Sequence, residues 1–321
     1  MGKKTKIWLI VAGSAILLGC IIFGVVMSML GWDFTKLSTV QYVTNEHSIS
    51  EKFEHIRIDT KTADIVFAPS EDGNVRVVYR EEKKVAHTAT VEDGTLVISV
   101  VDTRKWYDYI GINFGSPGIT VYIPQGQYGA LSVKSDTGKV ELPQNFGFES
   151  IDVTVDTGNV ICRASSLGNV KIRTSTGKIS VENITAGAVD LTTSTGNVVV
   201  ANVNCQADLR IDVDTGDVNI TDVRCRSLVS DGDTGDIVLQ NVIAFERFSI
   251  ERDTGNVQFV GCDAGEIFVE TDTGDVKGSL LSEKMFIAHT DTGRVNVPQS
   301  VTGGKCQITT DTGNIQITVA K

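Results

Sequence analysis

Residues 209–220 read LRIDVDTGDVNI, and residues 228–239 repeat the pattern as LVSDGDTGDIVL. On both sides of the Thr-Gly pair, apolar residues alternate with polar ones. A period of two is typical of β-strands that bury one face. The stretch therefore predicts two short strands that meet at the glycine.

Ten Thr-Gly pairs follow one another at spacings of 19 or 20 residues. Asp precedes the Thr in eight copies, with Ser175 and Ser194 as the exceptions, and Val or Ile stands two positions after every glycine. The corner glycines are Gly138, Gly158, Gly177, Gly196, Gly216, Gly235, Gly255, Gly274, Gly293 and Gly313. A coil of this length cannot bury its apolar face alone, but stacked coils pair their backbones and make the apolar columns continuous. We therefore predict an all-β, single-stack β-solenoid, a rod of roughly 48 Å at about 4.8 Å per coil.

Each corner has its own turn chemistry. Glycine adopts a positive φ without steric cost, and Asp or Ser side chains hydrogen-bond nearby backbone amides in Asx and ST turns. We therefore expect the ten glycines to be structural, with the Asp or Ser two positions earlier closing the turn. A further apolar residue seven positions after the glycine, as at Ile184, Val203 and Val223, predicts a third short side of each coil.

The repeat begins before its first glycine. Residues 56–67 match the template at the same offsets, with Ala63 in place of the glycine, whereas residues 102–117 interrupt the period. We therefore predict that residues 52–130 form irregular first coils and a cap, because an open solenoid end exposes an edge for aggregation. The regular repeats follow over residues 131–321.

The N-terminus carries a membrane signal. Residues 7–30 form an uncharged, mainly apolar run that is long enough to cross a bilayer as a helix, and three lysines precede it. The positive-inside bias places residues 1–6 in the cytoplasm as a short tail and the rest of the chain outside the cell. Residues 31–51 are then a juxtamembrane linker, and the protein is a single-pass cell-membrane protein with an extracellular solenoid.

Two alternatives to an uncleaved anchor stay open. A cleaved signal peptide usually has a shorter apolar region, followed by a small-residue cleavage site. Residues 17–20, which end at Cys20, resemble a bacterial lipoprotein box, but Leu18 is unusual there and residues 21–30 continue apolar.

Charge and cysteine usage exclude several functions. The chain of 321 residues has a formal net charge of −11, which argues against a nucleic-acid partner because phosphate binding depends on Lys and Arg. None of the six cysteines forms a CxxC pair, so a metal cluster or redox motif is unsupported. Cys205 and Cys225 share one register, and a disulfide between them stays open.

The D-T-G motif also occurs in aspartic proteases. Their chemistry needs two carboxylates that converge and share a proton, whereas copies at a solenoid period form a ladder along one edge. We therefore predict no catalytic residue and no cofactor.

Two sets of residues could contact ligands. The ladder could bind Ca²⁺, since hard cations favour carboxylate oxygens, although the nine-residue repeat of calcium-binding β-rolls is absent. Its members are Asp214, Asp233, Asp253, Asp272, Asp291 and Asp311. The second set, Trp106, Tyr107 and Tyr109, could stack on a sugar or cover apolar surface of the cap.

The N-terminal anchor, the strand at residues 119–123 that ends at Pro124, and the repeated T-G-[DN]-[VI] units together resemble the bacterial putative-adhesin family of unknown function. The resemblance covers residues 52–321. It implies a β-solenoid and supplies no catalytic residues, and some members of the family belong to operons that respond to cell-envelope stress.

The leading hypothesis is a non-enzymatic, membrane-anchored envelope protein whose acidic rod binds a protein or glycan at the cell surface. One alternative is an envelope-stress regulatory component that acts through a membrane partner. Another is a polysaccharide-active β-helix enzyme, against which the absence of a localised Asp, Arg and Lys cluster speaks.

Overall fold

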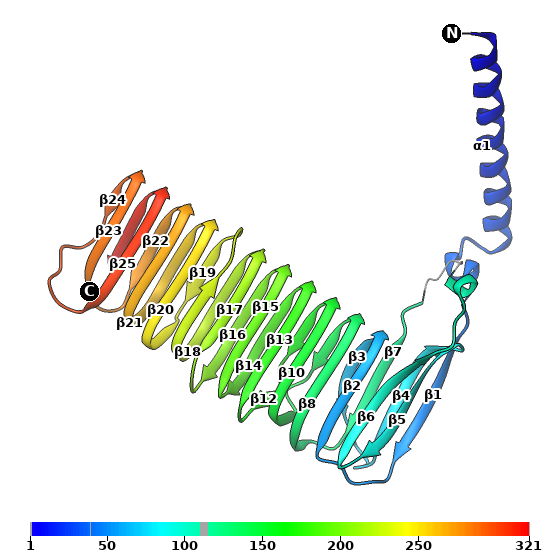
Figure 1. Ribbon diagram of the computed structural model, residues 1–321, viewed down its shortest axis with the longest axis horizontal. Helices are drawn as coiled ribbons and strands as arrows, with labels where there is room; N and C mark the ends of the chain where they lie inside the picture. Colours follow the sequence, from blue (N-terminus) through cyan, green and yellow to red (C-terminus); the bar gives the residue numbers. More distant parts are fainter. Residues whose placement is uncertain (1, 39, 110–114, 321) are drawn as a thin grey trace.

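A computed structural model describes residues 2–38, 40–109 and 115–320. It consists of one N-terminal helix, α1 (Lys3–Met29), two short 3₁₀ helices, and 26 strands joined in one continuous sheet that winds into a rod (Figure 1). The 3₁₀ helices are η1 (Phe34–Leu37) and η2 (Trp106–Tyr109). The predicted fold class, a β-solenoid with one N-terminal apolar helix, is confirmed.

The regular coils stack in parallel and in register. The Thr before each corner glycine pairs with the Thr of the next coil, as in Thr157 with Thr176 and Thr176 with Thr195. Equivalent residues therefore form columns along the rod. The strands of these coils are β8 (Gly126–Thr137), β9 (Val140–Leu142), β10 (Phe146–Thr157), β11 (Val160–Cys162), β12 (Ser165–Ser166), β13 (Asn169–Thr176), β14 (Ile179–Ala186), β15 (Ala188–Thr195), β16 (Val198–Cys205), β17 (Leu209–Thr215), β18 (Val218–Asp231), β19 (Ile237–Gln240), β20 (Ile243–Thr254), β21 (Val257–Thr273) and β22 (Val276–Leu280).

The core of the rod is a set of apolar columns, with buried hydroxyls in some of the coils. The predicted third side is present, because Ile184, Val203 and Val223 are buried. Four coils carry a buried Thr three positions before the corner glycine, and its hydroxyl donates to the glycine carbonyl of the neighbouring coil, as Thr193 does to Gly177 at 3.3 Å. These bonds link adjacent coils inside the core.

The described cysteines are all free thiols. Cys205 and Cys225 are buried without a disulfide between them, and burial raises the pKa of each to about 12. A thiol with so high a pKa is unreactive at neutral pH, so both residues act as small core side chains.

The repeat does begin before its first glycine. β2 (His55–Thr62) and β3 (Asp64–Pro69) pair in parallel with β8 and β9, in the register that places Ala63 at the corner. β6 and β7 still pair in parallel with β2 and β3, and the sheet then turns antiparallel. Strands β1 and β4–β7 form what we call the N-terminal cap (Figure 1). Its strands are β1 (Tyr42–Ile49), β4 (Val75–Glu82), β5 (Val85–Glu92), β6 (Thr95–Asp102) and β7 (Gly118–Ile123).

Residues 31–51 are more than a linker. β1 pairs antiparallel with β4 over its whole length, from Tyr42 opposite Glu82 to Ile49 opposite Val75. Its side chains are mainly exposed, so its place in the cap depends on backbone hydrogen bonds rather than on a buried face. A sequence pattern based on apolar alternation does not detect such a strand.

The last two coils lie in exchanged order. β25 (Gly304–Thr312) pairs with β21 on one side and with β23 (Lys284–Thr292) on the other, so the later coil lies between two earlier ones (Figure 1). β26 (Ile315–Val319) likewise lies between β22 and β24 (Val295–Asn296). The expectation that successive turns lie directly over one another is therefore wrong for these coils.

The two exchanged coils carry different side chains at paired positions. On the inner face, Phe286 and Ala288 of the terminal coil lie opposite Cys306 and Ile308 of the internal coil. On the outer face, Met285 and Ile287 of the terminal coil are 44% and 55% exposed.

The helix α1 is long and apolar enough to cross a membrane, with a mean hydropathy of 2.7 over its most apolar window and no part of that window buried. This is compatible with a membrane anchor or a signal peptide. Toward its C-terminal end, Met27 is fully buried and Phe23 lies 6.5 Å from Phe34 of η1, ring centroid to centroid. The base of the helix is therefore packed against the segment that leads into the cap.

Candidate functional site

The corners require glycine for two reasons. Gly216 has φ of 149°, and a Cβ atom on it would lie 2.2 Å from the carbonyl oxygen of Gly196 in the neighbouring coil. The other corner glycines stand in the same relation to their neighbours. Stacking thus depends on the absence of a side chain at this position.

The residue after the glycine, rather than the Asp before the Thr, connects the corners. Asn197 accepts a hydrogen bond on Oδ1 from the backbone N–H of Asp217 at 3.0 Å, and Asp217 accepts one from Asp236 at 3.1 Å. We call this chain of bonds the corner ladder. Among the described residues, the D-T-G aspartates make no such bond to a turn amide. The role predicted for them, accepting a backbone N–H at the corner, is performed by the residue after the glycine.

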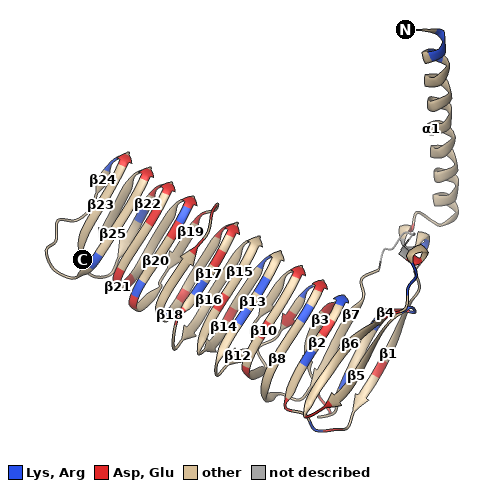
Figure 2. Cartoon of the chain, in the orientation of Figure 1, with Lys and Arg blue, Asp and Glu red and all other residues tan. Residues whose placement is uncertain are grey.

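The D-T-G aspartates point into solvent. Figure 2 shows acidic residues at the ends of successive strands along the rod. Burial together with Asp214 and Asp231 raises the pKa of Asp212, which shows that carboxylates crowd here. Within the described ranges, no group of three or more His, Cys, Asp or Glu side chains is placed to hold a metal ion. Ca²⁺ binding by the ladder from Asp214 to Asp311 stays a prediction.

A second corner, six residues after four consecutive corner glycines, forms an elongated groove. There Asn183, Asn202, Asp222 and Asn241 adopt left-handed backbone conformations with φ of 52–58°. Two adjoining hollows of ≈ 300 and ≈ 430 Å³ share Asn202, Asp222 and Arg224 as lining residues, and together they form one groove along the rod. We call it the amide groove; it extends from Ser165 to Leu281 and is also lined by Asn183, Ile184, Thr185, Val203, Asn204, Asn241, Ile243 and Gly261.

Hydrogen bonds between coils order the floor of the amide groove. The side-chain nitrogen of Asn202 donates to Oδ1 of Asn183 at 2.9 Å, and that of Asn241 donates to Oδ1 of Asp222 at 3.0 Å. Arg224 lies exposed at the centre and has no ion pair among the described residues. The groove therefore presents a guanidinium between rows of polar groups that repeat at the strand spacing.

The amide groove was not predicted from the sequence. Its signal was visible as an Asn or Asp directly before the third-side apolar residue, at Asn183-Ile184, Asn202-Val203, Asp222-Val223 and Asn241-Val242. Asn and Asp are the non-glycine residues that most readily adopt positive φ, so the pattern marks a corner.

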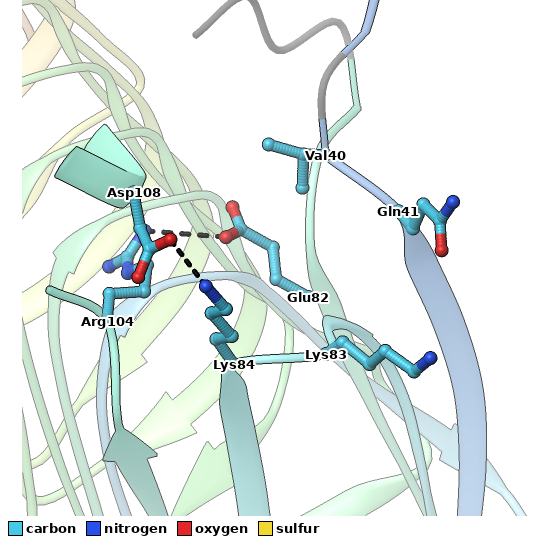
Figure 3. Close-up of a pocket in the computed structure, with 7 residues that line it drawn as sticks. All are labelled: Val40, Gln41, Glu82, Lys83, Lys84, Arg104 and Asp108. Atoms are coloured by element: carbon cyan, nitrogen blue, oxygen red, sulfur yellow. Dashed lines mark hydrogen bonds and ion pairs between the residues drawn. The ribbon is translucent and has the colours of Figure 1, made fainter. Parts of the chain in front are cut away.

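A second hollow lies between the cap and the base of α1. Figure 3 shows this cavity of ≈ 220 Å³, which is lined by Val40, Gln41, Glu82, Lys83, Lys84, Arg104 and Asp108. Lys84 pairs with Asp108, and Arg104 contacts Glu82 at 3.5 Å and Asp102 at 2.9 Å.

The charges of this cavity are matched in pairs. The hydrogen bond from Arg104 holds the pKa of Asp102 well below its usual range, and the hydrogen bond from Lys84 lowers the pKa of Asp108. Of the lining cations only Lys83 has no ion pair among the described residues. The pairs stabilise the cavity wall and leave little charge for a ligand.

Two of the predicted aromatic contacts lie on η2, beside this cavity. Trp106 is 76% exposed and Tyr107 is 49% exposed, and their rings meet edge to face at 5.8 Å. The ammonium groups of Lys84 and Lys105 lie 5.9 and 6.0 Å from the Tyr107 ring centroid. The side chain of Tyr109 lies outside the described residues. Neither Trp106 nor Tyr107 lines the amide groove.

A buried polar network occupies the centre of the cap. His87 contacts Thr60 Oγ1 through Nε2 at 2.9 Å and Glu81 Oε2 through Nδ1 at 2.9 Å, while Asn45 donates to Glu81 Oε1 at 2.7 Å. The order of hydroxyl, imidazole and carboxylate is that of a nucleophilic triad. Thr60 is only 2% exposed and His87 4%, so no substrate reaches the hydroxyl and the network is structural.

Comparisons with known proteins agree with the fold. The sequence profile of the Toastrack DUF4097 family matches residues 53–212 and 206–321. No curated protein matches the sequence.

Several solved structures match over most of their length. A putative adhesin from Bacteroides fragilis has 16% identity and a TM-score of 0.42, with 87% of this chain and 97% of that chain covered. A putative lipid binding protein from Parabacteroides distasonis has 14% identity and a TM-score of 0.47, with 88% and 98% covered. A putative adhesin from the same organism has 11% identity, the same TM-score and the same coverage. Similarity at this level carries no conclusion about function.

Proposed function

The chain belongs to the Toastrack DUF4097 family, and on that premise we propose that it is a non-enzymatic, membrane-anchored protein of the cell envelope that binds a linear acidic glycan along its rod. The anchor is α1, whose length and hydropathy suit a single span. The lysines before the apolar run favour a cytoplasmic N-terminus and an extracellular rod.

The observation that carries the proposal is the amide groove. It repeats polar side chains from coil to coil, so it suits a partner that is itself a repeating polymer. Amides and a guanidinium supply donors and acceptors for sugar hydroxyls and carboxylates. A folded protein partner would call for a continuous apolar core within its interface, which this polar groove does not offer.

The guanidinium of the groove has no ion pair among the described residues and favours an acidic glycan over a neutral one. Asp222, the anion that lines the same groove, accepts a hydrogen bond from Asn241. Arg224 can form a bidentate pair with a sugar carboxylate, an interaction that Asn202 and Asn204 cannot supply. The rest of the rod is acidic and repels such a polymer, so binding is confined to this corner.

The test uses the full-length protein in nanodiscs, with alginate as the acidic probe and a neutral linear glucan as the comparison. We expect alginate to bind more tightly than the glucan, and Arg224→Ala to weaken alginate binding at least about tenfold, a change of about 1.4 kcal/mol. Lys277→Ala is the matched control, because it removes an exposed cation outside the groove. No new polysaccharide ends should appear during incubation.

Equal loss of affinity in both variants would show a general charge effect and contradict the proposal. Absence of alginate binding by the unmodified protein would contradict it as well. Release of new ends would instead favour a polysaccharide-active enzyme.

A further inference from the structure

Four large aromatic side chains lie exposed at the base of α1. Trp32 and Phe34 follow the helix directly, and Trp106 and Tyr107 come from the insertion that interrupts the repeat. Scattered exposed apolar residues are normal on a soluble protein, but a local group of aromatic rings marks an interaction surface.

These two segments lie together although they are distant in sequence. Val40 and Gln41, which follow η1, line the same cavity as Arg104 and Asp108, which flank and form η2 (Figure 3). Figure 1 shows both 3₁₀ helices at the lower end of α1, on the side of the cap that faces the helix. The 3₁₀ helix η2 is thus held at the level where the apolar run of the helix ends.

That level corresponds to a membrane–water interface. A helix of 27 residues is about 40 Å long, which exceeds a hydrocarbon core of about 30 Å, so its ends reach the headgroup layer. Trp and Tyr are enriched at this depth because their rings combine an apolar body with a polar group.

Lysines lie beside the aromatic rings, and two of them have no ion pair among the described residues. Lys84 flanks the ring of Tyr107 but is paired with Asp108. Lys83 lines the cavity and Lys105 flanks the same ring, both without such a pair. Lysines beside interfacial aromatic residues are attracted to anionic headgroups, so Lys83 and Lys105 are the cations available to a membrane surface.

We propose that Trp106 and Tyr107, together with Lys83 and Lys105, insert into the anionic headgroup layer of the membrane that α1 spans. The helix η2 then forms a second attachment beside α1 and fixes the direction in which the rod leaves the membrane. This inference rests on the proposed anchor, and it gives Trp106 and Tyr107 a lipid partner rather than a sugar.

The test uses the full-length chain in liposomes and its three tryptophans, Trp8, Trp32 and Trp106. A Trp8→Phe/Trp32→Phe variant reports on Trp106 alone, and a Trp32→Phe/Trp106→Phe variant reports on Trp8 within α1. Quenching by phospholipids brominated near the headgroup measures insertion, and acrylamide measures exposure to water. Far-UV circular dichroism of each variant checks that the sheet is retained.

We expect bromolipids to quench both Trp8 and Trp106, and quenching of Trp106 to increase at least about twofold when phosphatidylglycerol is added to phosphatidylcholine. A Lys83→Gln/Lys105→Gln variant in the same background should lose that increase. Glu46→Gln, which alters an exposed charge on the cap, should leave it unchanged.

The quenching experiment distinguishes failure of the proposed α1 anchor from failure of the proposed attachment through Trp106. If Trp8 is quenched and Trp106 stays accessible to acrylamide, the interfacial attachment is wrong and the anchor stands. Protection of Trp106 by alginate alone would assign the aromatic residues to a glycan and overturn the lipid proposal. If neither tryptophan is quenched, the anchor is wrong and the second attachment falls with it.

Discussion

The regular coils and the N-terminal cap bury a sheet face in different ways. The coils use one rule repeatedly: a corner glycine, a polar residue after it, and a parallel pairing with the next coil. The cap uses antiparallel strands and one set of contacts that occurs nowhere else in the described chain, the network of Asn45, Glu81, His87 and Thr60.

The two regions differ in how far the structural effect of a substitution extends. In the coils, each contact is one of many equivalent contacts, but a corner glycine touches the backbone of its neighbour, so a change there propagates to the next coil. In the cap, a few side chains hold four strands together, so a single polar substitution affects the whole unit.

The largest effect is expected at a corner in the middle of the rod. Gly216→Ala places a Cβ atom 2.2 Å from the Gly196 carbonyl oxygen at a φ that disfavours alanine, and we expect a loss of at least about 3 kcal/mol. Hydrogen exchange should show lost protection in β17 and in the neighbouring strands β15 and β18. Gly126→Ala is the control, because no atom lies within 4 Å of its added Cβ. Similar protection in both variants would show that the corners tolerate side chains.

An intermediate effect is expected in the cap. Glu81→Gln places an amide N–H₂ against groups that donate to Glu81, namely His87 and Asn45, and should cost about 2 kcal/mol. Hydrogen exchange should increase in β1, β4 and β5 while the regular coils keep their protection. Glu46→Gln on the exposed side of β1 should change nothing. Loss of protection throughout the rod would mean that cap and coils unfold as one unit.

The smallest effects are expected for substitutions of two residues at a single corner, Asn256 and Asp253. Asn256→Ala removes the acceptor of the Asp275 backbone N–H, a bond of 2.9 Å, and should cost about 1 kcal/mol. Asp253→Ala removes a D-T-G carboxylate that makes no hydrogen bond among the described residues, and should change stability by less than about 0.5 kcal/mol. Local hydrogen exchange in β21 and β22 measures both. The opposite order would restore the Asx-turn role to Asp253.

Periodic features could be predicted from the sequence. The glycine spacing predicted the coils, and the match at Ala63 located the first coil, because a corner imposes the same residue types wherever it recurs. The interruption at residues 102–117 also indicated where the regular stack ends.

Features that depend on unique contacts could not be predicted. Strand β1 has no buried face to produce alternation, and the network around His87 joins residues from four strands whose pairing the sequence does not reveal. The exchange of the last two coils was not predicted because both carry the D-T-G motif. Their corners differ in the residue after the glycine: Asn314 accepts the Arg294 backbone N–H, whereas Arg294 has no side-chain acceptor for a further coil. The amide groove had a periodic signal, an Asn or Asp one position before each third-side apolar residue. Only the apolar residues were considered, because they predicted burial.

The exchanged coils separate the order of synthesis from the order of assembly. A ribosome makes residues 284–296 before residues 304–319, yet the later segment occupies the place next to β21 and β22. Each earlier coil can grow on a finished template, whereas the terminal coil has no permanent neighbour until the chain has been made beyond it. The tip can therefore reach this order only after residues 304–319 have been made, when the later segment takes the position next to β21 and β22.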